Sequence, residues 1–219
     1  MVDYKADISS RWSDLTSWMV ADVRDKWWSR IVDAYSEPHR HYHTLQHLYN
    51  VFQRYDEFKD SLKNRVAVAY AILFHDIVYD PKSQENEEKS ISCFKEFANE
   101  TTIDQTGLIC DLISASASHC TDAHMSAEAV GAEDVHYFLD FDMAILGSQP
   151  DEYAKYKTNI RQEYAHLADA TYDQERVKVL RLFLQIPNIF ATKAFRDKYE
   201  AIARSNIQAE VDELNAAAS

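Results

Sequence analysis

Glycine and proline are scarce in this chain, and their scarcity limits what the chain can fold into. The 219 residues include three glycines and four prolines. A sheet protein of this size needs many tight turns, which usually require glycine, proline or asparagine. Long helices need far fewer such residues. The sequence therefore predicts an all-α protein, and its length predicts a single-domain helical bundle over residues 1–219.

Apolar residues recur at helical spacing along most of the chain. We expect an N-terminal helix over 8–35 and a C-terminal helix over 192–215, both packed on a core of about 38–190. Within that core, the segment NRVAVAYAILFHD is apolar almost all round, which predicts a buried central helix. Another apolar helix, EDVHYFLDFDMAILG, is expected to end at Gly147 as its C′ residue.

The charge of the chain limits its partners. A formal net charge of −13 disfavours binding to nucleic acid or to anionic membrane surfaces. The three cysteines cannot all pair, and we find neither a CxxC motif nor a signal-peptide pattern. We therefore expect a cytoplasmic protein that binds no nucleic acid and no membrane. The tryptophans of the first helix could cover the bundle or pair two subunits in a homodimer.

The central apolar helix runs into His75 and Asp76. An ionised carboxylate left unpaired in such surroundings costs several kcal/mol. No lysine or arginine lies between Arg65 and Asp76 in the sequence, and a divalent cation suits a histidine beside an aspartate. The alternative is an aspartate that caps a turn and a histidine bonded to the backbone. Alone, the pair favours that alternative.

Two aspartates occupy the apolar helix FLDFDMAILG. Because they are two residues apart, they point to nearly opposite sides of the helix. Helical phase predicts that Asp142 faces the core and that Asp140 is more peripheral. A core carboxylate again needs a cation, either a metal ion or a buried arginine such as Arg176 or Arg181. Asp140 is the second choice as a ligand.

His47 is the last member of the predicted group. Thr44 is a suitable N-cap for the helix that contains His47, and the face of His47 continues into the core through Val51. Side chains from three helices of one bundle can together form a metal site. We therefore predict a metal site made of four inward-facing residues: His47, His75, Asp76 and Asp142.

The order His … His-Asp … Asp resembles the HD superfamily of metal-dependent phosphohydrolases. The strings RHYHTLQH (40–47), FHDIVYDP (74–81), NEEKS (86–90) and FLDFDMAILG (138–147) are similar to a bacterial branch of predicted metal-dependent HD phosphohydrolases. The resemblance extends from about Trp12 to Glu210. It implies an HD-type helical domain in which one divalent ion (Mn²⁺, Mg²⁺, Fe, Ni²⁺ or Co²⁺) is bound by His47, His75, Asp76 and Asp142.

The resemblance also implies an activity, namely hydrolysis of a phosphate ester or anhydride by metal-activated water. By analogy to the family, the substrate is expected to be a small phosphorylated compound, with a nucleotide preferred. Two alternatives remain open. One is a di-iron oxygenase on the same scaffold, which needs further ligands such as His119. The other is a non-catalytic, metal-stabilised module that senses nucleotides.

Other polar residues are candidates for catalysis or substrate binding. The catalytic candidates, for proton transfer or for orienting the metal-bound water, are Asp76, His43, Asp80 and Glu87. The candidates for binding phosphate are Arg40, His119, Arg161 and Arg176. Turn caps, solvated charges and ion pairs are the structural alternatives for these residues. His119 and His124 are also weighed as ligands of a second metal, but we expect His124 in a surface loop.

Overall fold

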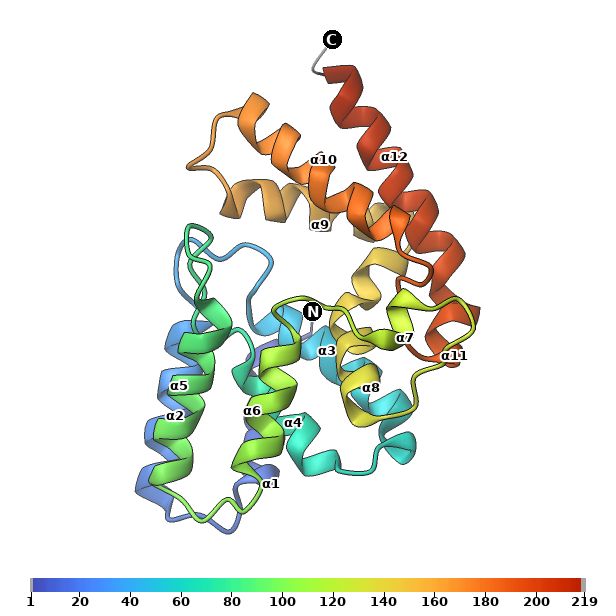
Figure 1. The fold of residues 1–219 in the computed structure, drawn as a ribbon. Coiled ribbons are helices and arrows are strands. Elements are labelled where there is room, and N and C mark those ends of the chain that lie inside the picture. Colours follow the sequence, from blue (N-terminus) through green and yellow to red (C-terminus); the bar gives the residue numbers. More distant parts are fainter. Residues whose placement is uncertain (1, 218–219) are drawn as a thin grey trace. The chain divides into compact units, whose positions relative to one another are not determined.

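A computed structural model describes residues 2–217 of the chain. Its regular elements are helical, and no strand occurs within that range. The chain divides into two compact units, Met1–Ser118 and His119–Ser219. The structure thus confirms the prediction of an all-α protein (Figure 1). The finer prediction, a single bundle of the HD type, stays a prediction.

The first unit is built around one buried helix. Every residue of this helix, α4 (Arg65–Phe74), is buried from Ala67 onward. Its neighbours include α3, α5 and α6, as Figure 1 shows. The predicted central helix is therefore confirmed. The other elements of this unit are α1 (Tyr4–Leu15), α2 (Ala21–Ala34), α3 (Leu45–Phe58), η1 (Lys59–Ser61), α5 (Asn86–Asn99) and α6 (Thr106–Ala115).

The prediction of one helix over 8–35 is wrong. The chain forms α1 and α2 instead, separated by a turn and by the extended residue Val20. The hydroxyl of Thr16 donates to the carbonyl of Trp12, and the amide of Met19 donates to the carbonyl of Thr16. Because the chain turns there, Trp12 of α1 and Trp27 of α2 both pack on Phe97, with ring centroids 5.5 Å and 5.2 Å away.

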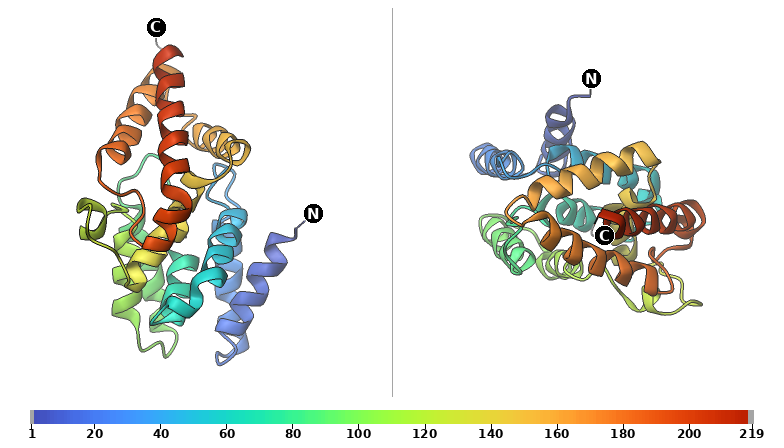
Figure 2. Two further views of the ribbon diagram at one scale, coloured as in Figure 1. Left: turned by 90° about the vertical axis from the view of Figure 1, so that its right-hand side faces the viewer. Right: turned by 90° about the horizontal axis from the view of Figure 1, so that it is seen from above.

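The second unit contains α10 (Asp169–Gln185) and α12 (Ala201–Ala217) side by side, as Figure 1 and Figure 2 show. The predicted C-terminal helix is found as three consecutive helical segments: α11 (Lys193–Phe195), the π-helical turn η3 (Arg196–Glu200) and α12. The other elements are α7 (Asp122–Met125), α8 (Asp134–Met143), η2 (Ala144–Gly147) and α9 (Pro150–Glu163).

Gly147 ends the helical stretch that begins with α8, but the prediction that it is the C′ residue is wrong, because Gly147 is the last residue of η2 and Ser148 is the C-cap. Its backbone does not adopt the left-handed conformation typical of a C′ glycine. Instead, a Cβ atom at this position would lie 2.5 Å from the Cβ atom of Tyr199. Glycine therefore permits η2 to approach η3 closely.

A helix that spans a membrane must be both long and apolar. Within the described part of the chain, no helix combines the length and the apolar composition that a membrane span needs.

Candidate metal centre

The histidines of the first unit are held by the start of α3 and the end of α4. Thr44 caps α3 by accepting a hydrogen bond from the amide of Gln46, so His43 precedes the helix and His47 lies in its first turn. His75 directly follows the last residue of α4. The side chains of His47 and His75 are buried, with 2% and 1% exposure. The predicted N-cap and the predicted burial of both histidines are confirmed.

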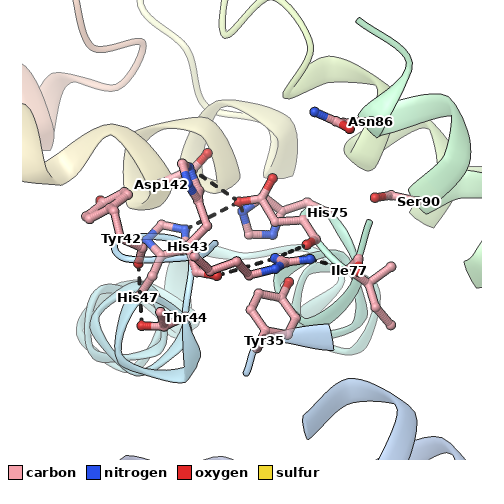
Figure 3. A network of polar contacts seen from close by, with 12 residues as sticks. Tyr35, Tyr42, His43, Thr44, His47, His75, Ile77, Asn86, Ser90 and Asp142 are labelled. Carbon is pink, nitrogen blue, oxygen red and sulfur yellow. Dashed lines mark hydrogen bonds and ion pairs between the residues drawn. The ribbon is translucent and has the colours of Figure 1, made fainter. Parts of the chain in front are cut away.

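The carboxylate of Asp76 faces three imidazole rings. Its Oδ2 atom lies 3.1 Å from Nε2 of His75, 3.8 Å from Nε2 of His47 and 3.9 Å from Nε2 of His43. One ring nitrogen of His47 and one of His75 are within 4.8 Å of each other. Figure 3 shows the three histidines gathered in one place. His43 and Asp76, which are 33 positions apart in the sequence, therefore lie close together in the structure.

The protonation of His75 follows from its contact with the backbone. Its Nδ1 atom lies 2.9 Å from the carbonyl oxygen of Ile72. Only an N–H group can make that hydrogen bond, so the Nδ1 atom carries a proton. In the neutral ring the lone pair on Nε2 then faces the carboxylate of Asp76. The lone pair on Nε2 and the carboxylate oxygen repel each other at this distance unless a cation or an additional proton lies between them.

The donor set fits a divalent metal. Two adjacent ligands at about 2.1–2.2 Å from an octahedral ion lie about 3 Å apart, close to the His75–Asp76 separation of 3.1 Å. A histidine ligand usually donates its other ring N–H group to a carbonyl or carboxylate, as His75 does to Ile72. The first unit therefore contains a His/Asp group that could bind a divalent metal ion.

Arg40 is not placed as the phosphate-binding residue that the sequence suggested. Its side chain has no solvent exposure, and its Nε atom donates to Glu37. Its two terminal nitrogens donate to the backbone carbonyls of His43, Asp76 and Ile77. The guanidinium is therefore directed at the backbone beside the histidines and away from solvent.

The two acidic candidates near the His-Asp pair lie at the surface of the first unit. Asp80 is exposed, and its Oδ1 atom accepts a hydrogen bond from the amide of Lys82, so its carboxylate caps a turn. Glu87 is half-buried in the first turn of α5, where an acidic side chain is favoured by the helix dipole. Both positions are consistent with the alternative that these carboxylates cap a turn or a helix N-terminus.

Asp142, the fourth predicted ligand, belongs to the second unit. It lies in the last turn of α8, and 11% of its side chain is exposed. The Nε2 atom of His119 lies 2.7 Å from Oδ2 of Asp142. The structure thus pairs a predicted ligand with a histidine that the sequence had suggested for phosphate binding. Partnership between His119 and Asp142 was not expected from the sequence.

Helical phase predicted that Asp142 is more buried than Asp140, and this prediction is wrong. Asp140 is 1% exposed and is the more buried of the two. Its Oδ1 atom accepts from the amide of Ala191, and its Oδ2 atom accepts from the amide and the hydroxyl of Thr192. Burial outweighs the lowering effect of these hydrogen bonds, so the pKa of Asp140 is raised to about 7. Asp140 therefore anchors the segment before α11.

The remaining candidates of the second unit have structural partners. Arg161 donates to the carbonyls of Tyr164 and Leu167 and to the carboxylate of Asp169. Arg176, which was the alternative partner for Asp142, pairs with Glu210.

The prediction that His124 lies in a surface loop is wrong. His124 is 1% exposed and lies in α7. Its Nδ1 atom accepts a hydrogen bond from the amide of Thr121, two residues after His119. Its backbone carbonyl accepts from the amide of Asn188. A contact with residue 188, so distant in sequence, could not be read from the local pattern.

Comparisons of the chain with protein-family models, with curated proteins and with solved structures found no match. Fold and site therefore define the class of protein on their own: an all-helical chain with a His/Asp group that could bind a divalent metal.

Proposed function

We propose that this chain is a metal-dependent phosphohydrolase of the HD type. In this proposal one divalent ion is held by His47, His75, Asp76 and Asp142. The observation that carries the proposal is the contact of 3.1 Å between Nε2 of His75 and Oδ2 of Asp76, with the proton of His75 fixed on the opposite side of its ring. A divalent cation is the simplest partner for this arrangement, because both atoms are metal ligands.

Asp142 is the fourth ligand in this proposal. Its place in the order His … His-Asp … Asp supports this role. So does its hydrogen bond with His119, because ligating carboxylates are usually held by such partners. His47, His75 and Asp142 each offer a ligand atom of a type that divalent ions bind.

The bound ion would lower the pKa of a coordinated water and neutralise charge on the phosphoryl oxygens. The residues of the chain have separate tasks. Asp76 lies among the three histidines and could orient that water. His43, half-buried and 3.9 Å from Asp76, is our candidate for the group that gives a proton to the leaving oxygen. The substrate class, a small phosphorylated compound such as a nucleotide, rests on the family resemblance.

The proposal is tested with purified protein and added Mn²⁺. We would measure Mn²⁺ binding by calorimetry, and phosphate release from a panel of phosphate esters and nucleotides. Wild type is expected to bind Mn²⁺ and to hydrolyse part of the panel, whereas Asp76→Asn and His47→Ala lose both properties. His41→Ala is the matched control, because His41 is an exposed histidine of the same segment. Equal activity in wild type and Asp76→Asn would refute the proposal.

A further inference from the structure

The backbone that follows the His-Asp pair is irregular, and side chains from elsewhere in the first unit bind it. Residues 76–80 form no helix, so their amide and carbonyl groups need other partners. From one side, Arg40 binds the carbonyls of Asp76 and Ile77, and the Nε2 atom of His39 donates to the carbonyl of Tyr79 at 2.8 Å.

Helix α5 holds the same segment through two of its side chains. The hydroxyl of Ser90 accepts from the amide of Val78 at 3.1 Å and donates to its carbonyl at 3.3 Å. The side-chain amide of Asn86 makes the same double contact with Asp80, at 3.0 Å for each bond. Figure 3 shows Ser90 and Asn86 together on this helix. Every residue from 76 to 80 thus has a backbone group bonded to a side chain.

Arg40 also connects this segment to the loop before α3. One atom, Nη1, donates to the carbonyl of Asp76 at 2.6 Å and to the carbonyl of His43 at 3.3 Å. The guanidinium lies over the rings of Tyr35 and Tyr79, with its Cζ atom 5.0 Å and 5.4 Å from their centroids. A buried cation costs free energy unless charged and polar groups surround it. Here the planar fork of Arg40 donates to three carbonyls and to one carboxylate at once, a spread of donors that the compact ammonium of lysine does not reproduce.

We propose that Arg40, Ser90 and Asn86 are positioning residues that fix the carboxylate of Asp76 against the histidines, a role that rests on the proposed metal site. None of them is proposed to touch the metal or the substrate. They act through the backbone: a rotation of this irregular segment would move Oδ2 of Asp76 away from Nε2 of His75. Such supporting residues typically contribute about tenfold to hundredfold to metal affinity.

The test compares matched pairs of variants by their affinity for Mn²⁺ alone. Arg40→Gln is compared with Arg204→Gln, because Arg204 also pairs with a glutamate and donates to three backbone carbonyls, but in the second unit. Ser90→Ala is compared with Ser92→Ala, whose hydroxyl donates to the carbonyl of Glu88 in the same helix. Hydrogen exchange at the amides of Val78 and Asp80 is measured in the same proteins without metal.

We expect Arg40→Gln to weaken Mn²⁺ binding about tenfold or more, and Ser90→Ala to weaken it by a smaller factor. Both should speed amide exchange within residues 76–80, whereas the two controls should change neither quantity. If Arg40→Gln does not fold, Ser90→Ala decides the question. Wild-type affinity in the folded Arg40 and Ser90 variants would overturn the positioning role and leave the metal site standing. Absence of Mn²⁺ binding in wild type would instead overturn the metal site, and the positioning role with it.

Discussion

His119 donates a hydrogen bond of 2.7 Å from its Nε2 atom to Oδ2 of Asp142. It does so from a left-handed backbone conformation, with φ of 49°, and no other non-glycine residue of the described chain has a positive φ. That conformation costs about 1–2 kcal/mol. Asp140, which precedes Asp142 on the same helix, is bonded at both oxygens to Ala191 and Thr192. The two aspartates of α8 therefore have different roles.

These roles predict opposite outcomes for the same substitution. Asp140→Asn replaces an acceptor oxygen by an N–H donor that faces a buried donor, so we expect a loss of about 2 kcal/mol in the free energy of unfolding. Asp142→Asn keeps an oxygen for His119, so its stability should change by less than about 0.5 kcal/mol. In the proposed site, however, Asp142→Asn should weaken Mn²⁺ binding about tenfold or more. Urea unfolding and a Mn²⁺ titration measure the two quantities. A stable Asp140→Asn protein would contradict the anchoring role.

The sequence predicted the fold class and the buried helix well, because these follow from local composition. Few glycines exclude a sheet-rich fold, and the run that ends at Phe74 is apolar on all faces. The break between α1 and α2 was missed, since no glycine or proline marks it. It depends on a side-chain bond from Thr16 to the carbonyl of Trp12, which apolar spacing does not reveal.

Helical periodicity correctly predicted which residues of the candidate site are buried where burial depends on one helix face. It failed where the position of a side chain depends on partners far away in the sequence. Burial of His47 and His75 follows from the faces of their helices. Helical phase failed for Asp140, because α8 buries consecutive residues on several sides, among them Phe138 and Phe141. The partners of Asp140 lie about fifty positions away, so its role could not be derived from the sequence around it.

A buried ion pair supports the second unit. Arg176 and Glu210 are 11% and 3% exposed, with Nε and Oε1 2.8 Å apart, and the hydroxyl of Tyr153 also donates to Glu210. Arg176→Met would leave a buried carboxylate without its cation, so we expect a loss of about 3 kcal/mol in the free energy of unfolding. Lys178→Met removes an exposed pair with Glu175 and should cost less than about 0.5 kcal/mol. Equal losses in urea unfolding would exclude this ranking.

Two glycines give a second matched comparison. Gly147→Ala places a Cβ atom 2.5 Å from the Cβ atom of Tyr199, and both atoms are fixed to the backbone. We expect a destabilisation of about 1–3 kcal/mol, because η2 and η3 must move apart. A methyl group at Gly107 of α6 would meet no packing neighbour within 4 Å, so Gly107→Ala should be neutral or stabilise by up to about 1 kcal/mol. Thermal unfolding at one pH distinguishes the two. A Gly147→Ala protein as stable as wild type would show that η2 and η3 can move apart without loss of stability, which would contradict this prediction.

Burial of His124 makes the second unit sensitive to acid. Burial, together with the nearby charges of His136, Arg196 and His119, lowers the pKa of His124 to about 4. The hydrogen bond that its Nδ1 atom accepts from the amide of Thr121 also favours the neutral ring. In the unfolded chain the pKa returns to about 6.5. Below that pH the unfolded chain binds a proton that the folded chain does not, so stability falls as the pH drops from about 6.5 towards 4.

The variant His124→Asn isolates this effect, because its side-chain oxygen can accept the same hydrogen bond from Thr121 but does not titrate. We expect wild type to lose about 2 kcal/mol relative to this variant between pH 7.5 and pH 4.5, a range that begins above the unfolded pKa of about 6.5 and ends just above the folded pKa of about 4. Other titrating groups, Asp140 among them, are common to both proteins and cancel in the difference. Urea unfolding of both proteins across this range measures it. A difference that stays constant with pH would mean that the pKa of His124 is the same in the folded and the unfolded chain, which would contradict the prediction.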